Sequence, residues 1–369
     1  MTKASILWIL KLGFKLLSLV LYLFTLISAY GGYFNPEWWT LPSIGVLFFP
    51  YLATATLIVA IIWLISRKFV IGCIGIGILF ACGPTFPDAL PFRFTNRASI
   101  SANTFRLVTF NCLHMKDSQV KEDEELPESN RSLNFLINSD ADFICLQELY
   151  AFGEPEIPNI YKPQIDTLLS LYPYTSGDKT RELEFISKYP FQRIEVKLDN
   201  EVKYGSCAAY RINIDGRKLT VINVHLPSYL LSEDERHIIT DVRSREDMKH
   251  SIQEFEGSIY KKMQTAYEIR AKVAGDIAEF AEKEEGNVII CGDFNDVPGS
   301  WSYRLFIKHG FEDAYAQTGF GYLVTYNEHM MWFHIDQILY KGELVPLWVK
   351  KERLNSSDHY PLIAEFEFI

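Results

Sequence analysis

The sequence predicts an α/β domain of two packed β-sheets with helices outside them, preceded by an apolar helical region. After about residue 104, eight segments rich in β-branched and aromatic residues follow one another, and only a few stretches of helical periodicity separate them. Many strands with few helices fit two packed sheets whose outer faces carry the helices. The first 98 residues are apolar and contain only two acidic side chains, so they form a separate region.

The two regions differ in charge. Residues 1–98 hold seven of the 36 Lys and Arg residues and two of the 46 acidic residues, which leaves 29 basic and 44 acidic residues, a net charge of −15, for residues 99–369. An acidic body repels polyanions, which argues against a long nucleic-acid track. It does not prevent a single phosphate from binding at a metal ion.

The apolar region predicts three membrane-spanning helices. Ser5 to Tyr30, Ile44 to Ser66 and Phe69 to Thr85 each approach the roughly 20 residues needed to cross a bilayer. The third segment is the shortest and the richest in glycine, so two spans with a re-entrant third segment are the alternative. A cleaved signal peptide would account for the first segment alone.

Basic residues predict the orientation of these spans. They lie near the N-terminus and between the second and third spans, at Lys3, Lys11, Lys15, Arg67 and Lys68. Residues 31–42 contain none, so the positive-inside rule places the N-terminus in the cytoplasm and the acidic body on the non-cytoplasmic side. Arg93 and Arg97, just after the third span, oppose this orientation. We therefore expect a multi-pass protein of the inner (cytoplasmic) membrane, with the lipid bilayer as a partner.

The body alternates between expected strands and a few expected helices. The strands are expected at residues 105–114, 141–149, 183–190, 206–214, 218–226, 287–295, 334–340 and 361–368. Helices are expected at Glu128 to Asn138 and at Gln253 to Lys283, and the charged runs 121–128 and 232–250 are expected to be solvated insertions. The domain plan is thus a transmembrane region at 1–86, a linker at 87–103 and a catalytic domain at 104–369.

Polar side chains recur at the ends of, or inside, six of the expected strands. They are Asn111, Glu148 after Gln147, Asn223 with His225, Asp293 with Asn295, Asp336, and Asp358 with His359. Any one of them has a structural interpretation: an asparagine that satisfies backbone groups, a histidine in the core, or Asp336 paired with His334. Six such placements together predict one common site.

The residue types suit metal-assisted phosphoryl transfer. Mg²⁺ takes oxygen ligands from a few carboxylates and keeps several waters, and Glu148 with Asn111 and Asp358 could supply them. The sequence lacks an HExxH motif or a Cys/His cluster, which makes zinc less suitable. The reaction also needs an activated water and donors for the developing negative charge. Asp293 is the candidate base, and His225 and His359 could donate to phosphate oxygens, with His359 paired to a carboxylate of Asp336 or Asp358.

Seven motifs resemble one known family. NCLH, LQE, ISKYP, NVHLPS, GDFNDVPGS, HIDQIL and SSDHYPL, in this order over about residues 104–369, are similar to the endonuclease/exonuclease/phosphatase superfamily, whose fold is that of pancreatic-type deoxyribonuclease. The resemblance implies a four-layer αββα sandwich and hydrolysis of a phosphodiester or phosphomonoester with Mg²⁺, or with Mn²⁺ as an alternative. With its apolar front, the chain resembles a membrane-anchored bacterial member.

The resemblance also implies a role for each site residue. Asn111 and Glu148 match metal-binding positions, Asp358 a second acidic metal or support position, His225 and Asn295 groups that hold the phosphate, Asp293 the base that activates water, Asp336 a residue that orients a histidine, and His359 the histidine that contacts phosphate. Asn223 and Arg181 are further candidates for binding substrate. This chain departs from the family pattern at His334, where an arginine is usual, and at residues 181–185, where a glycine-containing run is usual.

Two functions remain open on this basis. The first is a membrane-anchored, metal-dependent phosphoesterase acting on a nucleic acid, a phospholipid headgroup or a small phosphoester. The second is a catalytically inactive anchored binding or scaffold domain of the same fold. Glu148, Asp293 and His359 are all present, which favours the enzyme.

Overall fold

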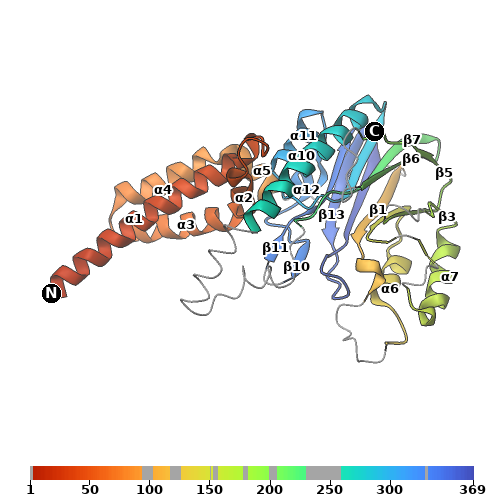
Figure 1. The fold of residues 1–369 in the computed structure, drawn as a ribbon, viewed down its shortest axis with the longest axis horizontal. Helices are drawn as coiled ribbons and strands as arrows, with labels where there is room; N and C mark the ends of the chain where they lie inside the picture. Colours follow the sequence, from red (N-terminus) through yellow and green to blue (C-terminus); the bar gives the residue numbers. More distant parts are fainter. Residues whose placement is uncertain are drawn as a thin grey trace.

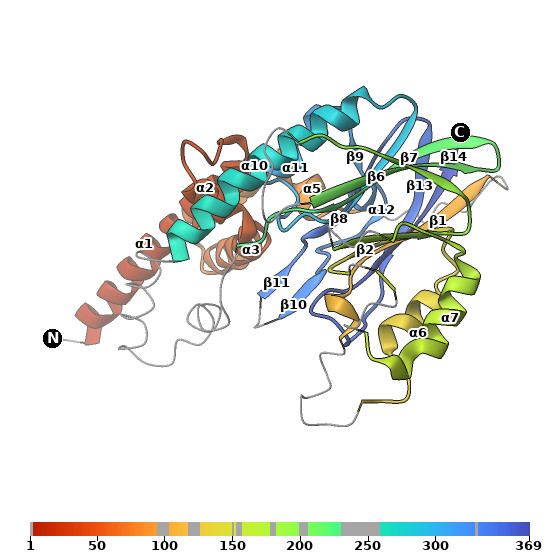
Figure 2. The ribbon, with the colours of Figure 1, turned by 45° about the vertical axis from the view of Figure 1, so that its right-hand side comes forward.

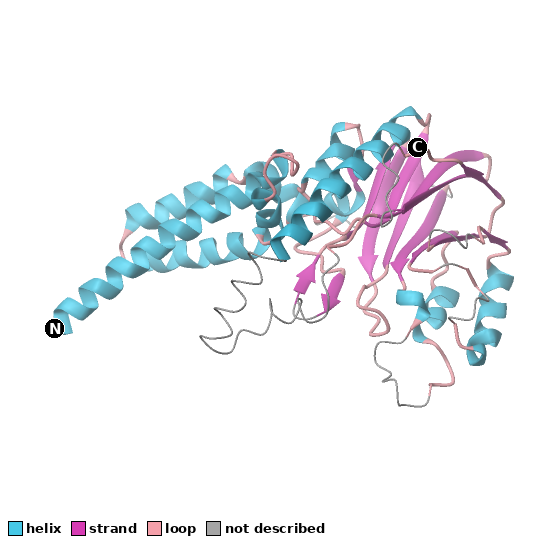
Figure 3. Ribbon diagram, viewed as in Figure 1, coloured by secondary structure: helices cyan, strands magenta, loops and turns pink. Residues whose placement is uncertain are grey.

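A computed structural model describes residues 3–93, 103–116, 126–149, 151–152, 157–177, 182–198, 206–229, 259–328 and 331–369. The body is a four-layer αββα sandwich, and an apolar helical bundle extends from one end of it (Figure 1). The predicted fold class is therefore confirmed. Figure 3 shows the helices of the bundle apart from the strands of the sandwich.

Two six-stranded sheets form the middle layers of the sandwich. The first has the order β13 (Leu344–Lys351), β14 (Leu362–Phe368), β1 (Thr104–Asn111), β2 (Phe143–Gln147), β4 (Leu183–Ser187) and β3 (Tyr174–Thr175). The second has the order β5 (Phe191–Ile194), β6 (Ser206–Ile214), β7 (Arg217–His225), β8 (Asn287–Asp293), β12 (Asp336–Lys341) and β9 (Glu312–Asp313). The pairs β1–β2 and β7–β8 are parallel, and the other paired strands are antiparallel.

Three apolar cores hold the layers together. The core between the sheets includes Phe105, Phe143 and Phe185 from one sheet and Tyr210 and Ile289 from the other. Helices α6 (Arg131–Asn138) and α7 (Lys162–Leu171) cover the outer face of the first sheet, and helices α10 (Tyr260–Lys283) and α11 (Trp301–Lys308) cover that of the second. The short helix α12 (Ala314–Thr318) packs at the edge of the inner core. Burial of these apolar faces is what orders the sandwich.

All eight expected strand segments are strands, but the sequence analysis missed several elements. Strand β13 was missed because Pro346 interrupts its apolar run, and the structure accommodates the proline with a register shift between Pro346 and Trp348. Helices α7 and α11 were also missed. Each has only eight to ten residues and a short apolar stripe. Most of the two expected insertions and the first residues of the second expected helix lie outside the described residues.

The apolar region forms a bundle of helices α1 (Lys3–Tyr30), α2 (Leu41–Leu47), α3 (Phe49–Ile65), α4 (Phe69–Ala81) and α5 (Phe86–Ala89). Within the described residues, only α1 is by itself long and apolar enough to cross a membrane. The second expected span is broken at Phe48, where α2 and α3 meet at 70°, and the third is bent by 45° after α4. Up to three spans result if each bent pair crosses as one.

Helix α2 packs against the sandwich rather than continuing the line of α3. Its Ile44 and Leu47 share an apolar cluster with Tyr267 of α10, with Val297 and with Tyr326 of β10 (Tyr326–Glu328). Figure 2 shows α2 beside α10, with the hairpin of β10 and β11 (Met331–Phe333) below them. Lys272 of α10 also lies 3.1 Å from the carboxylate of Glu37, just before α2. The apolar bundle and the sandwich therefore share a packed interface.

Candidate active site

Six polar side chains meet at one edge of the two sheets. Asn111 ends β1, Glu148 follows β2, His225 ends β7, Asp293 ends β8, Asp336 begins β12, and His359 lies just before β14. The carboxyl ends of parallel strands lie at the same edge of a sheet, so β1–β2 and β7–β8 each deliver two of these side chains to it. β12 runs antiparallel to β8 and pairs Asp336 directly with Asp293.

The carboxylate of Asp293 is the centre of this group. Its Oδ2 accepts a hydrogen bond from Asn111 Nδ2 at 3.1 Å and lies 3.7 Å from His225 Nε2 and 3.6 Å from His359 Nε2. The Asn111 amide also donates to Glu148 Oε1 at 2.9 Å. Asp293 is 1% exposed, whereas the side chain of Glu148 is 25% exposed. The site is therefore buried at Asp293 and open to solvent at Glu148.

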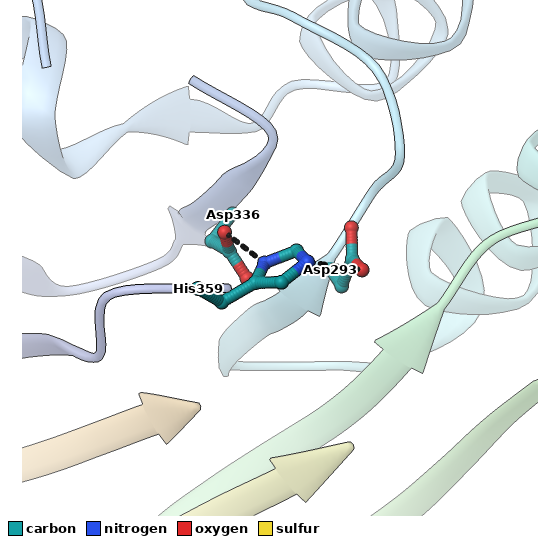
Figure 4. Close-up of side chains that lie close together, drawn as sticks. All are labelled: Asp293, Asp336 and His359. Carbon is teal, nitrogen blue, oxygen red and sulfur yellow. Dashed lines mark hydrogen bonds and ion pairs between the residues drawn. The ribbon is translucent and has the colours of Figure 1, made fainter. Parts of the chain in front are cut away.

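His359 lies between two carboxylates (Figure 4). Its Nδ1 is 2.8 Å from Asp336 Oδ2, and its Nε2 faces Asp293. Burial by itself lowers the pKa of His359, but the charges of Asp336 and Asp293 outweigh burial and raise this pKa well above its ordinary value. Burial raises the pKa of Asp336, and His359 opposes that shift. The ring is thus held as a proton donor to two acids.

The backbone at the site adopts conformations that side chains rarely take. Glu148 and Asn295 have φ of 55° and 48°, in the left-handed region. Gly292, directly before Asp293, has φ of 145°, and a Cβ there would collide with the carbonyl oxygen of Val224 on the neighbouring strand. Strained backbone persists only where the surroundings hold it, and it gathers at functional sites. This glycine is what lets β8 approach β7 closely where Asp293 leaves the sheet.

Hydrogen bonds from Asn295 hold the Asp293 carboxylate and the loop that follows it. The backbone N–H of Asn295 donates to Asp293 Oδ1 at 2.8 Å, and the Asn295 side chain donates to the carbonyl of Leu226 at 2.8 Å. Asn295 therefore ties the loop after β8 to the loop after β7. It is 9% exposed, so it lies at the border of the buried group.

The remaining predicted residues lie apart from this group or outside the described residues. Asn223 is buried between the sheets, where it accepts from Gln147 at 2.7 Å and donates to the carbonyls of Leu146 and Glu184. The carboxylate of Asp358 lies 3.2 Å from Ser357 Oγ, and among the described residues it acts on the group through its charge on His359. Arg181 lies outside the described residues. Their roles stay predictions.

His334 does not replace the arginine that is usual at its position. It is 1% exposed, packs edge-on against Tyr315, and burial lowers its pKa to about 3. It is therefore neutral and carries no positive charge for a phosphate. Asp336 pairs with His359 and not with His334.

Sequence reasoning missed three residues that support His359. Ser357 Oγ donates to the Asn111 carbonyl at 2.9 Å and accepts from the His359 N–H, so it joins both sides of the site. Thr325 Oγ1 accepts the backbone N–H of Asp336 at 3.0 Å. The ring of Tyr326 lies 5.1 Å from that of His359. Ser357 was visible in the SSDH motif, whereas nothing in the sequence near Thr325 points to the site.

Two sets of side chains could hold a metal ion. Ligand atoms of Asp293, Asp336 and His359 all lie within 4.8 Å of one another. In this set, however, both ring nitrogens of His359 already face carboxylates. In the second set, Asn111 Nδ2 donates to both Glu148 Oε1 and Asp293 Oδ2, so the two carboxylates lie next to each other, and Asn111 Oδ1 accepts from the N–H of Leu113 at 3.3 Å. These are the oxygen donors that a hard divalent cation prefers, and the exposure of Glu148 leaves room for water ligands.

Comparison with known families agrees with the fold and the motifs. A model described as the Endonuclease/Exonuclease/phosphatase family matches residues 108–359, which is more than half of the chain. The chain belongs to this family, whose members mostly hydrolyse phosphoester bonds. A comparison with curated proteins finds no relative by sequence.

Solved structures similar to this chain include three with low sequence identity. An endonuclease/exonuclease/phosphatase from Beutenbergia cavernae is 13% identical, with a TM-score of 0.49 over 72% of each chain. One from Bacteroides vulgatus is 15% identical, with a TM-score of 0.48 over 72% of this chain and 99% of that chain. The catalytic domain of human Nocturnin with bound sulfate is 16% identical, with a TM-score of 0.45 over 76% of this chain and all of that one.

Proposed function

We propose that this protein is a membrane-anchored, metal-dependent phosphoesterase in which Asp293 activates the attacking water. The observation that carries this proposal is the convergence of one amide and two imidazole groups on the buried carboxylate of Asp293, with Glu148 beside it. A structural role for Asp293 would need one or two partners, whereas three side chains from separate segments, Asn111, His225 and His359, lie around this carboxylate.

Glu148 and Asn111 are the residues that would hold Mg²⁺ or Mn²⁺, with Asp358 as a more distant acidic support. The ion would supply positive charge against the phosphate oxygens and the leaving oxygen. Every other part of the reaction falls to the chain itself. Asn295 holds Asp293 through its backbone N–H, so the carboxylate is fixed as it accepts the proton of the attacking water.

The two histidines are suited to bind the phosphate. His225 Nε2 lies 3.7 Å from Asp293 and 3.9 Å from Glu148, at the more open side of the group. His359 is oriented by its hydrogen bond to Asp336, which fixes Nδ1 and leaves Nε2 facing the centre. Donors placed in advance of the reaction stabilise the charge that develops on a phosphate in the transition state.

Membrane anchoring is supported by the apolar bundle. Helix α1 is long enough to cross by itself, and α3, with 17 residues, spans about 25 Å. This is less than the roughly 30 Å of a bilayer core, so all of α3 must be immersed if it crosses. We propose that the bundle crosses the inner membrane, with the sandwich on the non-cytoplasmic side as the basic residues predict.

This anchoring would bring the site close to the bilayer surface. The His359 ring contacts Tyr326, which pairs with Phe333 across the hairpin, and the Phe333 ring lies 6.2 Å from Phe48 at the start of α3. The hydroxyl of Tyr51, in the first turn of α3, donates to the carbonyl of Trp332 on the same hairpin. A phospholipid headgroup is therefore the favoured substrate class. Small phosphoesters and nucleic acids are the alternatives.

Hydrolysis of bis(4-nitrophenyl) phosphate by the purified full-length protein tests the reaction. We expect a rate that requires Mg²⁺ or Mn²⁺ and that falls by at least about 100-fold in Asp293→Asn and His359→Ala, since general acid–base groups contribute about 10²–10⁴. Asp140→Asn, an exposed acid with a side chain 78% exposed, is the control and should keep the wild-type rate. Equal rates in all four proteins would refute the assignment, and a wild-type protein without activity would favour the scaffold.

A comparison of substrates tests the proposed class. Full-length protein in nanodiscs should release phosphorylated headgroups, or phosphate, from lipids of the same disc faster than it cleaves soluble nitrophenyl esters or single-stranded DNA at matched phosphate concentration. Faster cleavage of DNA would assign the protein to the nucleases.

A further inference from the structure

A buried arginine outside the group of active-site residues contacts the two loops that follow His225 and Asp293. Arg270 lies in the middle of α10 and is 0% exposed. Arginine is rarely buried without paired partners, because its charge must be compensated where water is excluded. Its contacts therefore indicate what it does.

The guanidinium of Arg270 forms hydrogen bonds with the loop after β7. Its Nε and Nη2 both donate to the carbonyl of Pro227, at 3.0 and 2.8 Å. Its Nη1 donates to the hydroxyl of Tyr229 at 3.3 Å, and the guanidinium stacks 4.5 Å from the centre of that ring. This loop begins directly after His225, and its Leu226 accepts the hydrogen bond from Asn295.

The same guanidinium reaches the loop after β8. Nη1 lies 3.5 Å from Oδ2 of Asp296, which is 2% exposed. The Asp296 carboxylate also accepts from Ser302 at 2.6 Å and from the N–H of Val297 at 3.0 Å, so it ties its own loop together. Asp296 is three residues after Asp293. One side chain thus joins the loop that follows a phosphate-binding histidine to the loop that follows the base.

The network continues into the apolar bundle. The Tyr229 hydroxyl donates to that of Tyr267, and the Tyr267 hydroxyl donates to the carbonyl of Ser43 in α2 at 3.2 Å. Arg270 also stacks 5.0 Å from the Tyr267 ring. A chain of buried polar contacts therefore connects helix α2 with both active-site loops.

We propose that Arg270 is a positioning residue that fixes the loops after β7 and β8 relative to each other. The apolar bundle is then part of the active-site scaffold, because Tyr267 connects it with these loops. The expected fall in kcat rests on the proposed hydrolytic function. The expected loosening of the two loops does not. A planar fork is needed to donate twice to the Pro227 carbonyl while facing Asp296, and lysine, with one ammonium group, cannot reproduce it.

The test compares full-length Arg270→Lys with wild type in detergent, by kinetics and by hydrogen–deuterium exchange. At assay temperatures below the unfolding temperature of the variant, we expect kcat to fall at least tenfold and KM to stay within about twofold of the wild-type value. Exchange should rise in peptides covering 223–229 and 291–299 and stay unchanged in peptides covering 105–111. Arg106→Lys is the matched control, because Arg106 pairs with Asp140 and Glu365 on the other sheet, and it should leave kcat unchanged.

Two further variants separate positioning from folding. Arg270→Met with Asp296→Asn removes both charges together, so it leaves no unpaired buried charge. It should fold, and it should show the same loss of kcat and the same rise in exchange. Tyr267→Phe removes the hydroxyl that accepts from Tyr229 and donates to Ser43, so it cuts the link to α2 and leaves Arg270 in place; it should lower kcat about two- to fivefold. Tyr172→Phe, which removes a buried hydroxyl contact with Ser139 far from the site, should not.

Hydrogen–deuterium exchange decides whether Arg270 holds the two loops. Unchanged exchange in both loops for Arg270→Lys would overturn the inference, as would a lower unfolding temperature with an unchanged kcat. A wild-type protein without phosphoesterase activity would refute the proposed function alone, because the exchange measurement still shows whether Arg270 holds the loops.

Discussion

At the scale of single residues, strand ends were the informative feature of the sequence. Polar residues placed at the ends of six strands were enough to expect Asn111, Glu148 and Asp293 at one site. In the structure, the parallel pair β1–β2 brings Asn111 beside Glu148, and the parallel pair β7–β8 brings His225 beside Asp293. The sequence left the partner of Asp336 open, because both His334 and His359 were candidates. His334 is two residues away in sequence and His359 is 23, and only the packed sheet brings His359 into contact. Thr325 and Tyr326 were missed for the same reason.

Replacing Asp336 tests the orientation of His359. Asp336→Asn keeps the shape of the side chain but removes the charge that holds Nδ1. We expect kcat to fall about 10- to 100-fold, as for other residues that orient a catalytic ligand or base, with little change in KM. Steady-state kinetics measure this. A variant as active as wild type would show that the pair is not needed for turnover.

Asp313 predicts a dependence of stability on pH. It caps α12 through the N–H groups of Tyr315 and Ala316, and burial raises its pKa to about 7. Between pH about 4 and 7 the folded state keeps a proton on Asp313 that the unfolded chain has lost, so this group lowers stability as pH rises through that window.

Asp313→Asn removes this titration while keeping an oxygen for the cap. Wild type should lose on the order of 2 kcal/mol more than the variant between pH 5 and 7.5. Thermal unfolding of the two proteins at both pH values measures the difference. The same pH slope in both would contradict the assignment.

At the scale of elements, long strands with β-branched residues were predictable and short or interrupted elements were not. Strands β7 and β8 have clear apolar runs, and their parallel pairing defines the site. Helix α2 was taken as the start of a span because its composition matches that of α3. It packs against α10 and Val297, so it also belongs to the interface with the sandwich. Composition cannot report this contact.

Because Gly292 has no side chain, β7 and β8 can approach each other closely at this position. In Gly292→Ala, the methyl group would meet the Val224 carbonyl in a conformation that alanine rarely takes. We expect a loss of about 3 kcal/mol or more in unfolding free energy, together with loss of activity, because Asp293 is the next residue.

Gly286→Ala is the matched control for this substitution. Gly286 also has positive φ, at 78°, but a Cβ there would meet open space. The unfolding free energy of Gly286→Ala should fall by only about 1 kcal/mol, which reflects backbone strain alone. Equal losses in the two variants, measured by denaturant unfolding, would show that the close approach of the strands does not matter.

At the scale of the whole molecule, composition separated an apolar front from an acidic body, and the structure places these as a helical bundle and a sandwich. The number of spans could not be settled from composition, because the breaks at Phe48 and after α4 leave one to three crossings. The fold class followed from many strands with few helices. The interface between the bundle and the sandwich had no signal in the sequence.

Reporter fusions test the orientation of the whole chain. A phosphatase that is active only outside the cytoplasm, fused after Ile369, should be active if the bundle crosses three times. A fluorescent protein that folds only in the cytoplasm should be dark at the same position. The opposite pattern would indicate an even number of crossings, and release of the chain from membranes by high salt would exclude a span.

The most direct measurement of the central claim is the position of a bound ion. Crystals of the full-length protein soaked in Mn²⁺ should show an anomalous peak within about 2.5 Å of a Glu148 carboxylate oxygen, close to the Asn111 amide. The Glu148→Gln variant, soaked in the same way, should lose the peak. An ion that instead replaces the contact between Asp336 and His359, or a peak that survives in Glu148→Gln, would contradict the account.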